Sequence, residues 1–155
     1  MKKLIAITAA AAIVAITGTA MAADTNTLTV QASVSGTCKF SSSTSTLNFG
    51  ALDPSSAADA NTNTTTQFWC TKGVTTDSIT AGQGLHWSGA QRQMLAAGTS
   101  GDLIPYDLTL TPDSNANAGP TSPRTLTIAG SIVNADYINK TADNYSDTVT
   151  LTLTP

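Results

Sequence analysis

The chain has 155 residues, which suits one domain with a single core, and only 11% of them are charged. Ten acidic residues, all Asp, outnumber seven Lys and Arg, so the net charge is −3. Such a sparse, acidic charge pattern argues against a partner that is nucleic acid or an anionic lipid surface. Thr, Ser, Asn and Ala supply the polar surface instead, which is typical of a strand-rich extracellular protein rather than a cytosolic enzyme.

The first 22 residues have the layout of a secretory signal peptide. Lys2 and Lys3 precede an apolar stretch over residues 4–16, and Ala20-Met21-Ala22 provides a small-x-small cleavage site. A membrane anchor is the alternative, but the stretch is shorter than the roughly 20 residues of a spanning helix. We therefore expect cleavage after Ala22, which leaves residues 23–155 with five basic and ten acidic residues.

Cys38 and Cys70 are the only two cysteines. In an exported chain such a pair predicts a disulfide. Closing a loop of about 33 residues would stabilise the fold by roughly 3–4 kcal/mol on the chain-entropy model. A metal site is the alternative, but it needs about four ligands, and two cysteines with one histidine do not supply them. We expect no bound metal and no cofactor.

Alternating hydrophobicity predicts an all-β chain. Residues 27–34 read T-L-T-V-Q-A-S-V, and residues 148–154 read T-V-T-L-T-L-T. Both have the period of a half-buried strand. Shorter strands are predicted in chain order over 46–49, 65–70, 75–80, 104–110, 124–129 and 131–133. About seven short strands separated by Ser, Asn, Asp, Gly and Pro clusters predict an antiparallel sandwich.

Three local features refine this prediction. Pro105 places its strand at a sheet edge or puts residue 105 near the strand's start, because proline lacks the N–H of a ladder. Gly130, between two short strand candidates, suggests a bulge. Residues 90–97 have weak helical character without a convincing cap, so a loop or an isolated turn is expected there.

Catalytic chemistry is absent from the pattern. His86 is the lone histidine, and Ser88 beside it has no nucleophile-elbow context. Gly82-Gln83-Gly84 lacks the length and the Lys of a phosphate loop. An exposed loop histidine is the expected role of His86, and we expect neither an enzyme nor a small-molecule substrate.

The alternating segment at residues 27–34 has two possible uses. It can pair with its own sheet, which the pattern alone favours, or it can be donated to the sheet edge of another molecule. In either case Leu28, Val30, Ala32 and Val34 form its apolar face. A strand of about eight residues spans roughly 26 Å.

The chain resembles the spore coat protein U family, which supplies subunits of archaic chaperone–usher pili. The residues that carry this resemblance follow one another along almost the whole of residues 23–155. They are Cys38, Thr46-Leu47-Asn48-Phe49-Gly50, Cys70-Thr71-Lys72-Gly73, Ile79-Thr80-Ala81-Gly82, Arg92-Gln93-Met94, Ile104-Pro105-Tyr106-Asp107-Leu108, Ala129-Gly130-Ser131-Ile132 and residues 145–153. Their order and spacing, rather than any single piece, make the match specific.

The resemblance implies an incomplete immunoglobulin-like sandwich over residues 37–155, whose final strand is supplied in trans. Residues 23–36 would be the donor extension, with Leu28, Val30, Ala32 and Val34 entering a neighbour's groove. A periplasmic chaperone would fill the groove first, and at an outer-membrane usher the next subunit would replace it. The product would be a surface pilus, most simply a homopolymer, that serves adhesion or biofilm formation.

Other functions remain open on the sequence. A self-complete secreted adhesive or carbohydrate-binding module would pair residues 27–34 with its own sheet and offer Trp87 as a stacking surface. A hydrolase would depend on His86. The family's name also permits a spore-coat component.

Overall fold

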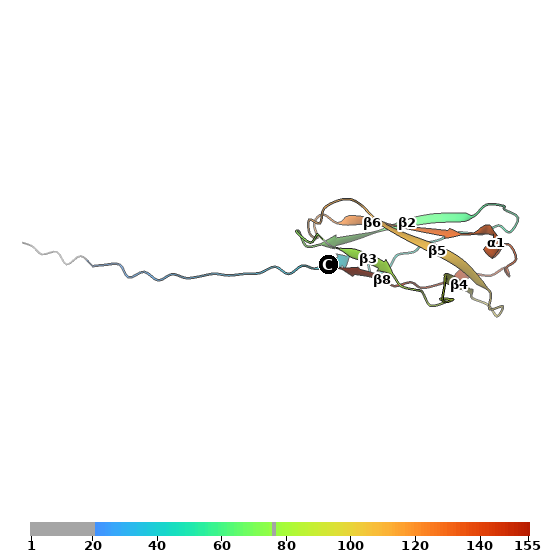
Figure 1. Cartoon of the computed structure of the whole chain (residues 1–155), viewed down its shortest axis with the longest axis horizontal. Coiled ribbons are helices and arrows are strands. Elements are labelled where there is room, and N and C mark those ends of the chain that lie inside the picture. Colours follow the sequence, from blue (N-terminus) through green and yellow to red (C-terminus); the bar gives the residue numbers. More distant parts are fainter. Residues whose placement is uncertain (1–20, 76) are drawn as a thin grey trace, which may run out of the picture. The chain divides into compact units, whose positions relative to one another are not determined.

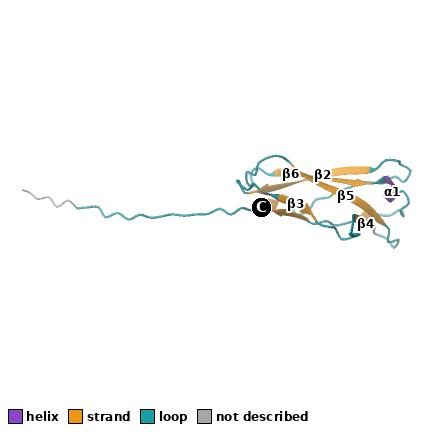
Figure 2. Ribbon diagram, viewed as in Figure 1, coloured by secondary structure: helices purple, strands orange, loops and turns teal. Residues whose placement is uncertain are grey.

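The computed structural model describes residues 21–75 and 77–155, and every strand and helix within them lies after residue 33 (Figures 1 and 2). The chain divides after Ser33 into two units, and the second runs from Val34 to Pro155. The predicted signal peptide lies outside the described residues, except for Met21 and Ala22. Within the described part of the chain, no helix is both long enough and apolar enough to span a membrane.

Two antiparallel sheets make up the second unit. The larger has the strand order β1-β2-β6-β5-β4-β7, and the smaller pairs β3 with β8. Figure 1 shows β2, β6 and β5 side by side in one layer, with β3 and β8 in the other. The strands are β1 (Cys38–Phe40), β2 (Ala60–Cys70), β3 (Ser78–Ala81), β4 (Arg92–Ala96), β5 (Leu103–Pro112), β6 (Arg124–Ile132), β7 (Tyr145–Ser146) and β8 (Leu151–Thr154). The predicted all-β antiparallel sandwich is confirmed, and the final strand supplied in trans stays a prediction.

The core follows from the alternation of side chains along β2 and β6, which are neighbours in the large sheet. In β2, Phe68 and Cys70 point inward and are fully buried, and in β6, Leu126 is fully buried and Ile128 is buried. Leucines and isoleucine of β3 and β8 pack against this cluster from the other sheet. Burying apolar area at about 25 cal/mol per Å² is what holds the two layers together.

A second buried cluster closes the other end of the sandwich. It consists of Ile104, Tyr106, Ile132 and Tyr137. Tyr137 belongs to α1 (Asn134–Tyr137), a single helical turn, and its hydroxyl donates a hydrogen bond of 2.8 Å to the Ala58 carbonyl. The turn therefore fixes the loop before β2 to the end of β6.

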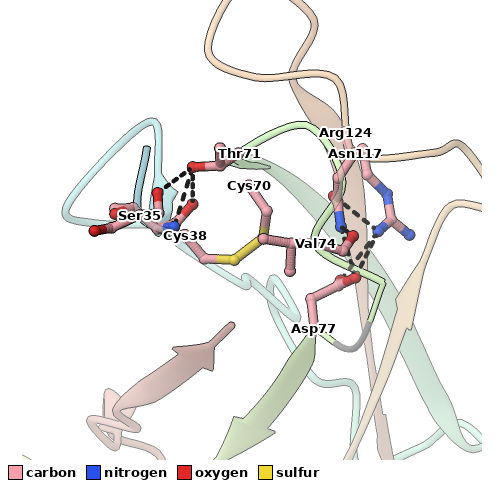
Figure 3. The surroundings of a disulfide bond; sticks show 9 residues. Ser35, Cys38, Cys70, Thr71, Val74, Asp77, Asn117 and Arg124 are labelled. Carbon is pink, nitrogen blue, oxygen red and sulfur yellow. Dashed lines mark hydrogen bonds and ion pairs between the residues drawn. A yellow bond between two sulfur atoms is a disulfide. The ribbon is translucent and has the colours of Figure 1, made fainter. Parts of the chain in front are cut away.

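The predicted disulfide is confirmed, and it joins β1 to β2 at directly opposed positions, Cys38 and Cys70 (Figure 3). Beside it, Thr71 accepts a hydrogen bond from the Thr37 amide at 3.0 Å and donates one to the Ser35 carbonyl at 3.3 Å. The first residues of the second unit are thus tied to the end of β2 by one covalent bond and several hydrogen bonds.

A buried cation lies near the disulfide (Figure 3). Arg124 at the start of β6 is 8% exposed, and its guanidinium contacts the carboxylates of Asp77 and Asp113, each at 3.0 Å. It also donates to the Asn117 side chain at 3.2 Å and lies 4.9 Å from the centroid of the Phe68 ring. The cation connects three chain segments that would otherwise be separate loops.

Two local predictions are wrong. Residues 90–97, expected to form a loop or a turn, contain β4, because pairing with β5 on one side and β7 on the other overrides the helical preference of Arg92-Gln93-Met94-Leu95-Ala96. Gly130 does not mark a bulge, since β6 runs through it with continuous pairing to Thr62 and Leu108. Pro105 is the third residue of β5, before the pairing with β6 begins at Asp107, which agrees with the expected strand start.

Four predicted strands are absent or shortened in the described part of the chain, and of the strand predicted over 75–80 only the part from Ser78 belongs to β3. Residues 27–34 form no strand, and their side chains are exposed rather than half-buried. Residues 46–49 are also unpaired. Of the predicted strand over 148–154, only β8 at residues 151–154 forms. Residues 46–49 and 148–150, which lie outside any strand, border the same groove.

Candidate functional site

The sandwich contains a groove of about 660 Å³ between its two layers. Strands β2, β4, β5 and β6 of the large sheet form its floor. Two segments without strand pairing form its rims, namely residues 42–49, which we call the first rim, and residues 147–150, which we call the second rim. The groove is therefore bordered on both sides by segments that do not belong to any strand.

The floor is apolar with hydroxyl groups and carries no charged side chain. The residues that line it are Phe40, Thr64, Thr66, Met94, Tyr106, Leu108 and Ile128. Such a lining suits a neutral ligand with small apolar side chains, because burying an unpaired charge there would cost several kcal/mol. Its chemistry fits an extended peptide better than a polar metabolite.

The first rim is anchored at its far end. Leu47 and Phe49 point inward and are half-buried, and they lie over Gly130 of β6. A Cβ at position 130 would lie 2.6 Å from Cδ2 of Leu47, so the absent side chain makes room for this rim. The Thr62 hydroxyl adds a 3.0 Å hydrogen bond to the Asn48 carbonyl.

The second rim continues into β8, whose ladder is half used. One edge of β8 pairs with β3 from Ser78 to Ala81, and the Gly82 amide extends this pairing to the Thr150 carbonyl at 2.8 Å. Within residues 21–75 and 77–155, the other edge of β8 has no strand partner. A free edge over an apolar groove is a site that a further strand can fill.

Asp147 stands at the start of the second rim and is the polar centre of the site. Its side chain is 2% exposed. The Tyr106 hydroxyl donates to Oδ2 at 2.7 Å, and the Leu85 amide donates to Oδ1 at 2.9 Å. His86 Nδ1 lies 3.3 Å from the same Oδ1. One carboxylate thus holds β5, the loop after β3 and the second rim together.

The hydrogen bonds set the ionisation of this group. Burial by itself would raise the pKa of Asp147, but the bonds from Tyr106, the Leu85 and Thr148 amides and His86 together lower it below the ordinary value of 3.8. Burial and the neighbouring carboxylate raise the pKa of Tyr106. At neutral pH the pair is therefore a carboxylate that accepts and a phenol that donates.

Three of the four predicted donor residues are among the most exposed large apolar side chains of the described residues. Leu28 and Val30 are each 83% exposed and Val34 is 86% exposed. Ala32 is exposed as well. Leu28, Val30 and Ala32 belong to the unit that precedes the sandwich in sequence, and Val34 is the first residue of the sandwich unit. Their donor role stays a prediction.

Other sequence-based candidates fare differently. His86 is not a free loop histidine, because its ring is 29% exposed and contacts Asp147. Trp87 is partly buried, and the exposed apolar residue of that loop is Leu85, at 73%. Among the described residues, no group of three potential metal ligands gathers in one place.

Sequence reasoning missed Asp147, although a signal was present. It occupies the same phase as Val149, Leu151 and Leu153, which is the inward face of the predicted terminal strand. A carboxylate at an inward position needs partners, since an unpaired buried charge is costly. That requirement alone pointed to a hydrogen-bonded cluster at this end of the strand.

Comparison with known proteins adds the following. The family model of the Spore Coat Protein U domain matches residues 24–152. Among solved structures, the chain is similar to the CsuC–CsuE chaperone-tip adhesion subunit pre-assembly complex from archaic chaperone-usher Csu pili of Acinetobacter baumannii, with 20% identity and a TM-score of 0.49. That match covers 77% of this chain and 40% of the solved one. No curated protein matches the chain.

Proposed function

The chain belongs to the Spore Coat Protein U domain family, and from this premise we propose that it is a structural subunit of an archaic chaperone–usher pilus. Residues 23–36 act as a donor strand that enters the groove of a neighbouring subunit, and the next subunit to be added fills the groove of this one in the same way. The proposal includes export through the periplasm with cleavage after Ala22. It also includes a chaperone that fills the groove before assembly and an outer-membrane usher. The product is a surface homopolymer that serves adhesion or biofilm formation.

One observation supports this proposal: the same chain has an amphipathic segment that forms no strand and a groove beside a free strand edge that could accept such a segment. Leu28, Val30, Ala32 and Val34 are exposed on alternate residues, and the floor of the groove beside the free edge of β8 carries no charged side chain, with Asp147 at the start of the second rim. Alternate apolar side chains entering a groove, with backbone hydrogen bonds along a free edge, is how strand addition works. The self-complete alternative requires residues 27–34 to pair with their own sheet, and they form no strand.

The energetics favour a long-lived contact. Burying Leu28, Val30 and Val34 contributes about 1.5–3 kcal/mol each, or roughly 5–9 kcal/mol together before ordering costs. Each ladder hydrogen bond adds about 0.5–1.5 kcal/mol net. The total is an upper figure, because the extended reference chain overstates the area that becomes buried.

The test compares two charged substitutions on opposite faces of the donor segment. In Val30→Asp the new carboxylate must enter the apolar groove, whereas in Thr29→Asp it stays on the outer face, with the same change in net charge. We expect Val30→Asp to abolish polymers seen by size-exclusion chromatography and electron microscopy, and Thr29→Asp to leave them intact. Equal effects of the two variants would contradict the assigned face.

A mixing experiment separates donation from simple misfolding. A Val30→Asp chain keeps its groove, so it can receive a wild-type strand but cannot donate its own. Added in increasing amounts to wild-type chain during assembly, it should shorten the polymers in proportion to its fraction. Polymer length that does not change, although the Val30→Asp chain is folded, would overturn the proposal.

A further inference from the structure

Two aspartates four residues apart tether two different loops. Asp143 Oδ2 accepts a 2.6 Å hydrogen bond from the Gly98 amide, and Asp147 accepts one from the Leu85 amide, next to Gly84. In both cases a Cβ on the glycine would clash with the carboxylate oxygen. The two contacts are alike in chemistry and differ in location, since Asp147 lines the groove and Asp143 does not.

Asp147 lies where the chain changes sheets. Before it, β7 pairs with β4 in the large sheet, and after the second rim, β8 pairs with β3 in the small one. The loop over residues 82–86 makes the same crossing, from β3 toward β4. Asp147 bonds this loop through Leu85 and His86 and the floor strand β5 through Tyr106. The hydrogen bonds of Asp147 therefore join the two segments that cross between the sheets to the floor of the groove.

The second rim needs to be held in place because the edge that it shares with β8, on the side away from β3, has no strand partner among the described residues. Val149 on this rim and Leu47 on the other are half-buried apolar residues on either side of a groove. The hydrophobic effect favours the approach of the two rims, which would close the groove. The opposing restraint on this side comes from the hydrogen bonds of Asp147 and from the bond of the Gly82 amide to the Thr150 carbonyl. Arg92 supports the latter, since its guanidinium donates to the carbonyls of Ala81 and Gly82.

We propose that Asp147 is a positioning residue for strand uptake, which holds the second rim away from the first so that the groove stays open. This inference rests on the proposed function. The bonds to Tyr106 and Leu85 are made to separate oxygens of one carboxylate, and an amide has only one acceptor oxygen. Asp147→Asn therefore keeps the shape of the side chain and loses one of these two bonds.

The experiment uses the chain from residue 23 with Val30→Asp, which prevents self-assembly, and a fluorescent synthetic peptide of residues 24–36 with the natural sequence. The measured quantity is the rate of peptide uptake, well below the unfolding temperature. Asp147→Asn should slow uptake roughly tenfold, as expected for about one charged hydrogen bond lost from the open state. Amide hydrogen exchange at residues 148–150 in the empty chain should change in the same variant.

Asp143→Asn is the matched control, because it removes the equivalent charge and loosens a similar loop without touching the groove. Both variants should lose some unfolding stability, and Asp143→Asn should take up peptide at the parent rate. Tyr106→Phe removes a single donor to Asp147 and should give an intermediate slowing, which keeps the test valid if Asp147→Asn does not fold.

Three outcomes separate the hypotheses. If the parent chain takes up the peptide and Asp147→Asn and Tyr106→Phe do so equally fast, the positioning role is overturned and the proposed function stands. Equal slowing in Asp147→Asn and Asp143→Asn also overturns it, because general loosening then explains the effect. A folded parent that takes up no peptide overturns the proposed function and the positioning role with it.

Discussion

A Cβ on Gly130 would lie 2.7 Å from Cζ of the Phe49 ring, so the inner face of β6 has no room for a side chain at this position. Gly130 is buried in the middle of β6, where glycine usually weakens a strand by about 0.5–1 kcal/mol relative to Ala. The close approach of the first rim explains why glycine is present. Residues 47–49 have no ladder of their own, and contact with β6 replaces it.

Gly130→Ala should therefore destabilise the fold despite the better strand propensity of Ala. Overpacking against Leu47 and Phe49 is expected to cost about 1–3 kcal/mol, measured by urea unfolding. Ala129→Ser on the exposed face of the same strand is the control, and it should stay within about 0.5 kcal/mol of wild type. A stabilising Gly130→Ala would show that the first rim moves away freely.

The disulfide should account for a large part of the stability of the sandwich. Replacing Cys38 and Cys70 together with Ser removes the closed loop and is expected to lower the unfolding free energy by about 2–4 kcal/mol. Urea unfolding with and without reductant gives the same quantity for wild type. A reduced wild type as stable as the oxidised form would mean that the three residue pairs of β1 with β2 hold without the covalent bond.

Arg124 should be the most sensitive charged residue in the fold. Arg124→Met leaves Asp77 and Asp113 without their cation, and we expect a loss of about 2–4 kcal/mol, below the value for fully buried pairs because Asp113 is partly exposed. Arg124→Lys keeps the charge but not the planar guanidinium, and its unfolding free energy should lie between those of wild type and Arg124→Met. In a double-mutant cycle, Asp77→Asn should cost less in the Arg124→Met background than alone. Additive losses would contradict the coupling.

Acid should weaken the sandwich through specific carboxylates. Bonds from the Thr125 amide and Arg124, among others, keep the pKa of Asp113 below its usual 3.8, and the pKa of Asp147 is also lowered. A carboxyl group whose pKa is lower in the folded state stabilises fully above its unfolded pKa, and this contribution is lost as pH falls through the folded pKa. Stability should therefore fall once the pH drops below about 4.

The same linkage predicts which substitution blunts the acid response. Asp147→Asn is less stable than wild type at pH 7, but it should lose less stability between pH 7 and pH 3, because the titrating group is gone. Urea midpoints at the two pH values measure the difference. An identical acid loss in both proteins would mean that Asp147 does not contribute to it.

Strands with a local alternating pattern could be predicted from the sequence, whereas strands that depend on partners distant in the sequence could not. The predicted strand at 65–70 is real but begins at Ala60, because pairing with β6 recruits a polar Asn- and Thr-rich stretch with no apolar signal. Likewise β4 consists of residues with good helix propensity, and only its position between β5 and β7 makes it a strand.

The candidate site shows the same limit. The alternation that marked Leu28, Val30 and Val34 is visible in the sequence, whereas the groove is assembled from six parts of the chain and has no contiguous signature. The apolar phase of the 148–154 pattern holds, but residues 148–150 lie at the second rim outside any strand. A strand pattern reports which side chains can be buried and not which molecule buries them.

The disulfide at the base of the sandwich also determines how the molecule carries tension. A pull on Val34 reaches Cys38 after only three residues, of which Ser35 and Thr37 are hydrogen-bonded to Thr71. From there the load crosses a covalent bond into β2, the longest strand, rather than peeling β1 away one hydrogen bond at a time. A polymer of such subunits would extend little under force before whole sandwich domains had to unfold.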